Sequence, residues 1–247
     1  MTHKKIKKWW EDNSMDYQND HKIKIDISYG RGSPNEKVLK LIGNVKGKRV
    51  LELGCGGAQA GIAFAKKGAK VTGVDISEKQ IKFAKHLAQK NNTNIDFYQG
   101  DISELKMIKS SSQDIVFSAW AFEYIGDLRK CFKEANRVLK KQGIFIFSLD
   151  HPFWGVINKD NLKVKRSYFD SGEYKEPYRK GIFFAYHHTM SEIINPLIES
   201  GFILEKMIEP DSRKKNIGDY WLSNQSKKRI NTMKFIPSTI IFKAIKK

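Results

Sequence analysis

Apolar and polar stretches alternate regularly between residues 48 and 150. Short apolar runs, which predict strands, begin near residues 50, 69, 95, 114 and 144, and segments with apolar residues at helical spacing separate most of them. Strands that alternate with helices are typical of a parallel sheet with helices on both faces. The run at 144–149 is apolar throughout, as expected for a strand buried on both faces. We therefore predict an α/β core.

Local signals set the ends of the predicted helices. Capping-box patterns at residues 77–80 and 189–192 predict two helix starts. The helix before the fifth strand is expected to carry Lys140 and Lys141 in its last turn, where they suit the helix dipole. Gly143 is expected to stop that helix.

The chain before the core, residues 1–45, is interpreted as an N-terminal helical cap segment, and residues 46–150 as the ligand-binding core. The first segment carries a run of lysines followed by Trp9 and Trp10. Such a segment can lie on a membrane interface. We favour the alternative, a helix whose aromatic side chains pack over the core.

Residues 151–188 break the alternation and are rich in aromatic residues with charged residues between them. An insertion of this kind indicates a cap over a substrate pocket, with stacking of nucleic-acid bases as the alternative. Residues 189–247 are expected to complete the core with strands at 202–208 and 236–245. A long basic loop at 211–234 lies between these strands and could close over the site or contact a partner.

A glycine turn follows the first predicted strand. Glu52 lies near the end of that strand, and Gly54, Cys55 and Gly56 form the turn. Glycine tolerates positive φ and lets a ligand lie against the backbone, while the next helix directs free N–H groups at it. Position 59 is glutamine instead of the third glycine of the dinucleotide pattern G-x-G-x-x-G. The turn therefore suits a ligand without a pyrophosphate, and Glu52 suits a positive group on that ligand.

Two further predicted strands end in acids. Asp75 ends the second strand 21 residues after Gly54, where an acid accepts both hydroxyls of a ribose. Gly100 and Asp101 end the third strand. Since the carboxyl ends of parallel strands meet at one edge of a sheet, we expect these residues and Glu52 to surround one ligand.

The motifs E-x-G-x-G-G, V-D-I-S and Q-G-D-I, in this order and spacing, resemble those of class I S-adenosylmethionine-dependent methyltransferases. The resemblance is to their small-molecule branch, related to quinone-biosynthesis methyltransferases. It covers residues 48–150 well and residues 188–247 more weakly. It implies a three-layer Rossmann-like fold with a seven-stranded, mostly parallel sheet, in which an antiparallel last strand lies between the fifth and sixth. It also implies S-adenosyl-L-methionine as methyl donor, S-adenosyl-L-homocysteine as product, and an N-terminal segment that closes over the cofactor pocket.

The resemblance implies roles for the residues around the glycine turn. Glu52 would orient the methionyl amino group of the donor. Gly54 and Gly56 would let the backbone approach the donor, with Cys55 between them. Asp75 would bind the ribose hydroxyls.

Further residues are expected around the adenine and the methyl group. Ile76 would pack on the adenine, Asp101 would accept from its exocyclic amine, and the N–H of Ile102 would meet a ring nitrogen. Ser118 and Trp120, at the end of the fourth strand, would line the pocket near the methyl group.

A nucleophile that carries a proton needs a general base, although many methyl transfers need none. His151 is the best candidate, because it lies just past the carboxyl end of the fifth strand, where open α/β sheets bind ligands. Tyr124, His187 and His188 are alternatives. A histidine at a strand end is more often a hydrogen-bonded structural residue.

The formal net charge of +18 raises the question of a nucleic-acid partner. The excess comes from 37 lysines against 8 arginines, and it is scattered along the chain. Residues 118–122 also lack the N/D-P-P-Y/F stretch of many methyltransferases that act on amino groups of bases. We therefore favour a small-molecule acceptor over RNA and keep an RNA methyltransferase as the alternative. A non-catalytic cofactor-binding module and a dehydrogenase are further alternatives.

The remaining composition predicts a cytoplasmic protein. Cys55 and Cys131 have no metal-ligand spacing and are expected as reduced thiols, so we predict no metal site. The chain has no run of 18 apolar residues and no apolar segment behind its basic N-terminus, so we expect neither a membrane span nor a secretory signal. The sequence leaves the oligomeric state open.

Overall fold

The computed structural model describes residues 2–177, 181–213 and 229–247. Its helices are α1 (Thr2–His21), α2 (Glu36–Leu39), α3 (Gln59–Lys66), α4 (Glu78–Lys90), α5 (Leu128–Val138), α6 (Pro152–Val156), α7 (Met190–Glu199) and α9 (Ile230–Met233), with a 3₁₀ turn at Phe122–Tyr124. Its strands are β1 (Arg49–Leu53), β2 (Lys70–Asp75), β3 (Ile95–Gln99), β4 (Gln113–Ala119), β5 (Leu139–Asp150), β6 (Gly172–Pro177), β7 (Ile182–His187), β8 (Phe202–Ile208) and β9 (Thr239–Lys246).

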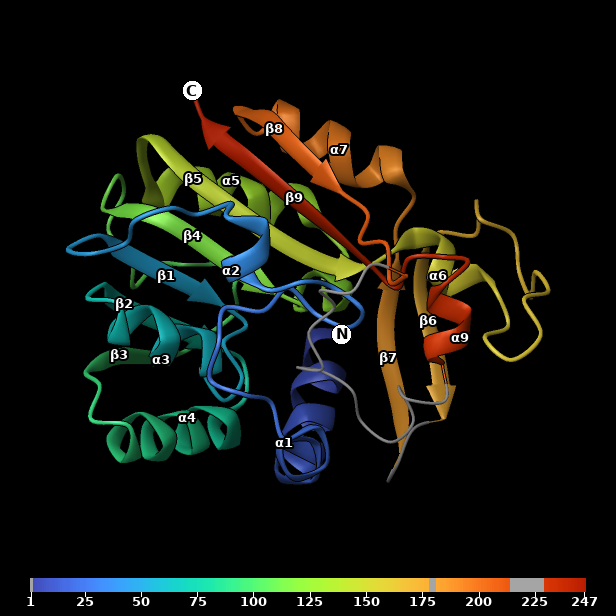
Figure 1. Ribbon diagram of the computed structural model, residues 1–247, viewed down its shortest axis with the longest axis horizontal. Helices are drawn as coiled ribbons and strands as arrows, with labels where there is room; N and C mark the ends of the chain where they lie inside the picture. The colour runs from blue at the N-terminus through green and yellow to red at the C-terminus, as the bar shows by residue number, and fades with distance from the viewer. Residues whose placement is uncertain (1, 178–180, 214–228) are drawn as a thin grey trace.

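Seven strands form the central sheet in the order β3-β2-β1-β4-β5-β9-β8 (Figure 1). Strands β1 to β5 run parallel to one another, whereas β9 is antiparallel to both β5 and β8. The order reverses between β1 and β4, which places a crevice at the carboxyl ends of these strands. The predicted α/β fold with an antiparallel last strand is confirmed.

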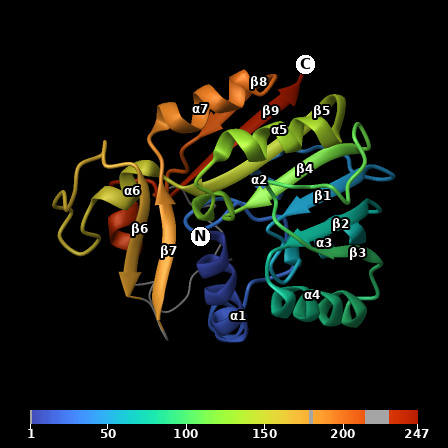
Figure 2. The ribbon, with the colours of Figure 1, turned by 180° about the vertical axis from the view of Figure 1, so that it is seen from behind.

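Helices cover both faces of the sheet, as Figures 1 and 2 show from opposite sides. On one face, α3 and the segment before β1 bury an apolar cluster that includes Phe64 and Phe117. On the other face, α5 and α7 pack on a larger cluster with Phe145 and Phe147 at its centre. The central strands are therefore buried on both sides, which explains their nearly continuous apolar sequences.

Both predicted helix starts are confirmed, but only the second is a complete capping box. The Ser77 hydroxyl accepts from the Gln80 N–H at the start of α4, and a capping box joins Thr189 and Glu192 at the start of α7. Pro196 lies inside α7, and the helix continues through it.

The predicted end of the helix before β5 is wrong. This helix ends at Val138, and β5 begins at Leu139, so Lys140, Lys141 and Gly143 belong to the strand. Leu139 is fully buried and pairs with Gln113 of β4. A longer helix would remove the apolar Leu139 side chain from the sheet, and it would gain only two exposed lysines in return.

Residues outside the sheet gather at its carboxyl edge. Helix α1 lies below that edge, beside α4 and β7 (Figure 1). As expected, the segment with Trp9 is helical and buries this side chain. In the predicted insertion, β6 and β7 form a separate two-stranded antiparallel sheet.

Of the predicted basic loop, residues 229–234 include α9, and residues 214–228 lie outside the described residues. The last strand begins at Thr239, three residues later than predicted.

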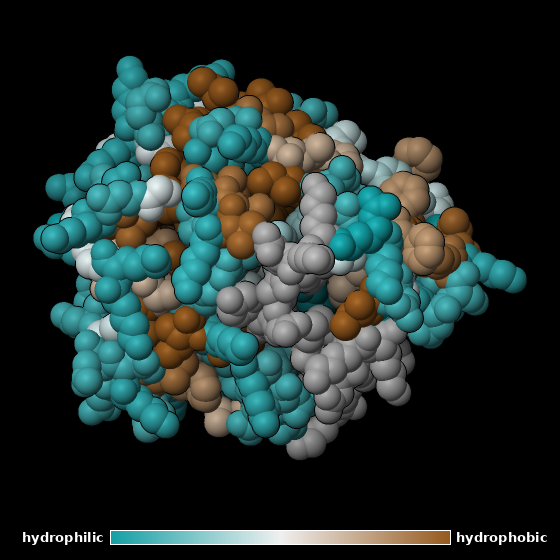
Figure 3. All heavy atoms as spheres, viewed as in Figure 1, coloured by the Kyte–Doolittle hydropathy of each residue, from teal (hydrophilic) through white to brown (hydrophobic). Residues whose placement is uncertain are grey.

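Hydrophilic residues cover much of the face in Figure 3, with hydrophobic residues between them. The edge strand β8 exposes Ile203 and Met207. Among the described residues, no helix is long and apolar enough to cross a membrane.

Candidate active site

The turn between β1 and α3 lies where the carboxyl ends of the central strands meet. Gly54 and Gly56 have φ of 62° and 51°, in the left-handed region. A Cβ at Gly54 would lie 2.3 Å from the Cβ of Ala121, which follows β4. Gly54 is therefore required both by the backbone conformation and by the close approach of the chain after β4.

Glu52 lies at the base of this turn and is buried. Its Oε2 accepts a hydrogen bond from the Gly61 N–H at 2.9 Å, and a Cβ at Gly61 would lie only 2.6 Å from this oxygen. Burial raises the pKa of Glu52 to about 8; the Gly61 N–H lowers it, and the charge of Asp75 raises it further. A positive ligand group would favour the ionised form of this carboxyl.

Asp75 ends β2 on the other side of the turn. Its Oδ2 accepts from the Gly56 N–H at 2.8 Å, and its Oδ1 accepts from the Ser77 N–H at 2.9 Å. Burial raises the pKa of Asp75 to about 6, although these two N–H groups oppose the shift. A carboxylate has about four lone-pair sites, so Asp75 can still accept from the hydroxyls of a ligand.

Asp101 follows β3 at the same edge. Its Oδ1 accepts from the Ser103 N–H at 2.8 Å, and its Oδ2 lies 2.5 Å from Nδ1 of His3 in the first turn of α1. A ligand amine bound to Asp101 would therefore share this carboxylate with His3. Gly100 precedes Asp101, and its N–H donates to the Asp75 carbonyl.

Helix α1 closes the site through a chain of buried amides. Gln59 of α3 donates to Gln18 of α1 at 2.8 Å, and Gln18 donates to Gln80 of α4 at 2.9 Å. Glu11 accepts from the Glu78 N–H at the start of α4 at 2.6 Å. None of these three glutamines was expected to line the site, because their pairing across α1, α3 and α4 has no local sequence signal.

Trp120 follows β4 in a strained conformation, with φ of 59°. A Cβ at Gly30 would lie 2.2 Å from Nε1 of Trp120, so the indole ring packs directly against this glycine. The Arg31 guanidinium stacks 4.0 Å above the ring and donates to Asp150 at 2.9 Å. Trp120 is thus held by two adjacent residues, Gly30 and Arg31, and Asp150 of β5 in turn holds Arg31.

Ser118 lies deeper than expected. Its hydroxyl is fully buried and donates to the Leu53 carbonyl at 2.9 Å, so it joins β4 to β1.

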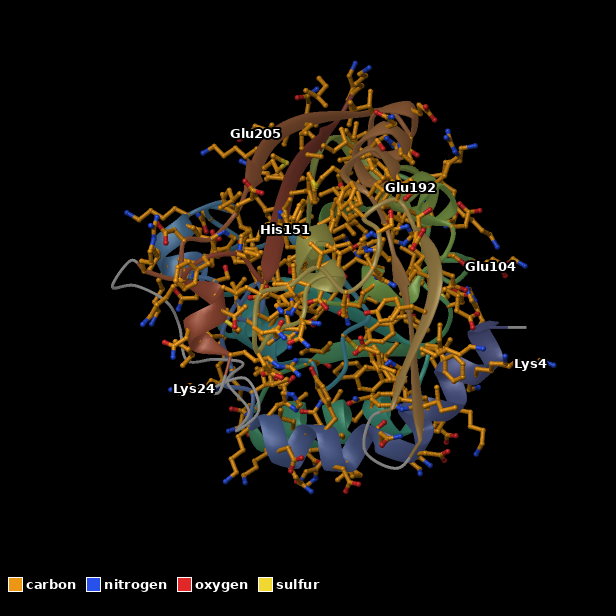
Figure 4. The ribbon with its side chains drawn as sticks, turned by 90° about the vertical axis from the view of Figure 1, so that its right-hand side faces the viewer. Lys4, Lys24, Glu104, His151, Glu192 and Glu205 are labelled. Carbon is orange, nitrogen blue, oxygen red and sulfur yellow. The ribbon has the colours of Figure 1, made fainter. Side chains whose placement is uncertain are left out.

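His151 caps α6 and is buried (Figure 4). Its Nδ1 accepts from the Phe153 N–H at 3.1 Å, which leaves Nε2 to donate to Glu209 at 2.8 Å. Burial lowers the pKa of His151, while Glu209 opposes the shift. His187 and His188 direct Nε2 at the carbonyls of Tyr168 and Ile125.

The site surrounds a cavity of about 1000 Å³, counted out to its open mouth. The predicted residues that line it are Glu52, Gly54, Cys55, Gly56, Asp75, Ile76, Gly100, Asp101, Ile102 and Trp120. Ser118 and His151 are not among the lining residues. The residues that the sequence analysis did not assign to the site include His3, Trp10, Tyr17, Gln18, Gln59 and Gln80. Within the described part of the chain, no cluster of histidine, cysteine and acidic residues could hold a metal ion.

The residues present fit the donor that the resemblance implies. Acids at three strand ends, of which Glu52 and Asp75 are buried, can accept from amino and hydroxyl groups, and the glycines leave room for the ligand beside the backbone. Nothing in the cavity wall resembles a pyrophosphate-binding loop, because Gln59 lies where the third glycine of the dinucleotide pattern would be.

Comparison with known proteins agrees with this geometry. A family model described as a methyltransferase domain matches residues 44–201. An uncharacterized protein of Haemophilus influenzae is 32% identical over 188 residues, which cover 70% of this chain and 74% of that protein. A ubiquinone biosynthesis O-methyltransferase of Pelagibacter ubique is 30% identical over 146 residues, or 58% of this chain and 60% of that protein. A crystal structure from Listeria monocytogenes, assigned as an S-adenosylmethionine-dependent methyltransferase, superposes with a TM-score of 0.69 at 25% identity, covering 86% of this chain and 97% of that one. The chain therefore belongs to the methyltransferase domain family and is an S-adenosylmethionine-dependent methyltransferase.

Proposed function

We propose that the protein transfers the methyl group of S-adenosylmethionine to a small acceptor with an aromatic or otherwise apolar body. The observation that carries this proposal is the aromatic wall of the cavity, made by Trp10, Tyr17, Trp120 and Tyr124. The ring of Trp10 packs edge-on against Tyr17 and Tyr124, with centroids 5.0 and 5.4 Å apart. Rings in this arrangement favour flat apolar ligands. The ubiquinone biosynthesis relative is consistent with such an acceptor.

The roles of the lining residues are part of the proposal. Glu52 holds the methionyl amino group, and Asp75 holds the ribose hydroxyls. Asp101 and the Ile102 N–H bind the edge of the adenine, while Ile76 packs on its face. The glycine turn gives the donor access to the backbone. Each role matches the side chain's chemistry and its position on the cavity wall.

The reaction is an in-line displacement. The acceptor atom forms a bond to the methyl carbon as the carbon–sulfur bond breaks, and the sulfur keeps the electron pair. Because the donor is already activated, the protein contributes alignment of the two reactants and exclusion of water. The proton of an acceptor hydroxyl or amine leaves to a base or to solvent. A base at His151 stays a prediction, and among the four candidate bases only Tyr124 lines the cavity.

Methyl-acceptor screening with isotopically labelled donor tests this proposal. We expect the label to move to small metabolites extracted from cells and not to purified RNA. If RNA is labelled and the metabolites are not, the acceptor proposed here is wrong.

A further inference from the structure

Arg166, in the segment before β6, carries an unsatisfied pair of donors. Its Nε and Nη2 are buried and have no hydrogen-bond partner among the described residues. These two atoms lie on one edge of the guanidinium and donate in parallel. That edge matches the two oxygens of a carboxylate or phosphate.

Packing holds this guanidinium in place. It lies 4.7 Å from the centre of the Tyr174 ring, and a Cβ at Gly155 would lie 3.3 Å from Nη2. Tyr174 pairs with Ala185 of β7, and Phe183, two residues away on the same face of β7, packs against Tyr124, which lines the cavity. Arg166 therefore packs on the face of the hairpin that reaches the wall of the proposed acceptor space.

The surrounding charges leave a positive excess. Lys165 is paired with Glu176 at 2.8 Å, and Arg31 with Asp150 at 2.9 Å. Lys159 has no ion pair within the described part of the chain; burial, and then the charge of Lys165, lower its pKa to about 8.

Arg166 and Lys159 differ in the acids around them. The charges of Asp150 and Glu176 act on Lys159 and oppose the lowering of its pKa. Within the described part of the chain, Nε and Nη2 of Arg166 have no acid as a hydrogen-bond partner.

A buried cation without an acceptor is costly, because it has lost its hydration and gained no partner in return. Proteins retain unpaired buried cations mainly at sites where a bound ligand supplies the missing hydrogen-bond acceptor. No described acid is a hydrogen-bond partner of Nε or Nη2 of Arg166, which leaves this edge open to an anion from outside the chain or to water.

We propose that the methyl acceptor carries an anionic group, a carboxylate or a phosphate, which the Nε–Nη2 edge of Arg166 binds with support from Lys159. The apolar body of the acceptor then extends past Tyr174 and Tyr124 toward the methyl donor. This inference rests on the proposed function and narrows its acceptor to a class of anions.

Binding to the protein saturated with S-adenosylhomocysteine tests the inference. The probes are 4-hydroxybenzoate, phenyl phosphate and the uncharged 4-hydroxybenzamide, measured by calorimetry. We expect at least one anion to bind about tenfold or more tightly than the amide, as a hydrogen-bonded charge pair contributes about this much. The anion that binds more tightly identifies the acceptor's anionic group as a carboxylate or a phosphate. Arg166→Gln should remove the preference.

Arg129→Gln is the matched control, since it removes an exposed arginine paired with Glu199 on the surface of α5. It should keep the anion preference. Arg166→Gln should unfold at the same or a higher temperature than the wild type, because it removes an unpartnered buried charge.

Equal binding of all three probes to the wild type would mean that water alone satisfies Arg166, and would overturn the inference. An anion preference that survives Arg166→Gln, or a large drop in its unfolding temperature, would also overturn it. These outcomes are separate from failure of the proposed function, which appears as methyl transfer to RNA in the labelling assay.

Discussion

At the scale of single residues, the proposed role of the buried carboxyl of Glu52 predicts that cofactor binding depends on pH. In the free protein its pKa is about 8, so it is mostly protonated at pH 7. The ammonium of the bound donor would favour the carboxylate, so binding should release a proton. We expect the affinity for S-adenosylhomocysteine to rise between pH 6 and pH 7.5. Glu52→Gln should weaken binding by roughly ten- to hundredfold at pH 7.5 and reduce this rise, measured by calorimetry.

The stability of the free protein provides the control for Glu52→Gln. Because the folded pKa lies above the unfolded value, Glu52 contributes most to stability below about pH 4.5, and this contribution is lost as the pH rises through 8. Glutamine does not ionise. The unfolding temperature of Glu52→Gln relative to wild type should therefore increase from pH 5 to pH 8. A lower relative stability at pH 8 would show that the loss of binding reflects misfolding.

Gly54→Ala separates steric contact from backbone strain. Gly47 has φ of 75° and nothing within 4 Å of a built Cβ, whereas Gly54 has φ of 62° and a Cβ that would meet Ala121. Gly47→Ala should cost about 1–2 kcal/mol of unfolding free energy from the left-handed conformation alone. Gly54→Ala should cost more and abolish cofactor binding, measured by denaturant titration and calorimetry. Equal effects of the two substitutions would show that the contact with Ala121 is unimportant.

At the scale of elements, Gln18 fixes α1 over the cavity. Its side chain accepts from Gln59 and donates to Gln80, and all three side chains are buried. Gln18→Leu leaves both partners unpaired, at about 1–3 kcal/mol each. We expect faster hydrogen exchange in α1 and faster dissociation of S-adenosylhomocysteine. Lys8→Ala, which breaks only the exposed pair with Asp12, should change neither rate. Unchanged exchange in Gln18→Leu would contradict this role.

The sequence predicted the central strands and the order of their motifs because strand burial and turn chemistry are local. It could not predict the contacts of α1, since Gln18 pairs with residues 41 and 62 positions away. The helix before β5 was predicted too long because the lysines suited a helix end. The helix ends earlier because Leu139 is buried in the sheet, which is a tertiary effect.

The depth of Ser118 illustrates a second limit of the sequence. In a strand buried on both faces, the pattern does not show which way each side chain points. Ser118 precedes the end of β4 and bonds to the backbone of β1, whereas Trp120, two residues later, lines the cavity. The acids that end β1 and β2 and follow β3 were easier to place, because a parallel sheet brings these ends to one edge.

At the scale of the whole molecule, the net charge of +18 and the proposed small acceptor predict different responses to salt concentration. The described ion pairs are spread over many elements, such as Lys82–Glu78 on α4 and Lys243–Glu205 between β9 and β8. A diffuse basic surface binds RNA without sequence preference, through counterion release. A protein that makes 6–10 phosphate contacts loses about 10³–10⁵ in affinity between 50 and 200 mM salt.

Methyl transfer to a small acceptor inside the cavity should respond far less to salt, because one or two buried charges replace the many surface contacts. We expect RNA binding, measured by fluorescence anisotropy, to fall by about a thousandfold or more between 50 and 200 mM NaCl. Over the same range, kcat/KM for the small acceptor should fall by less than about tenfold. A parallel fall of both quantities would mean that the reaction depends on the basic surface, and the acceptor would then have to be sought among nucleic acids.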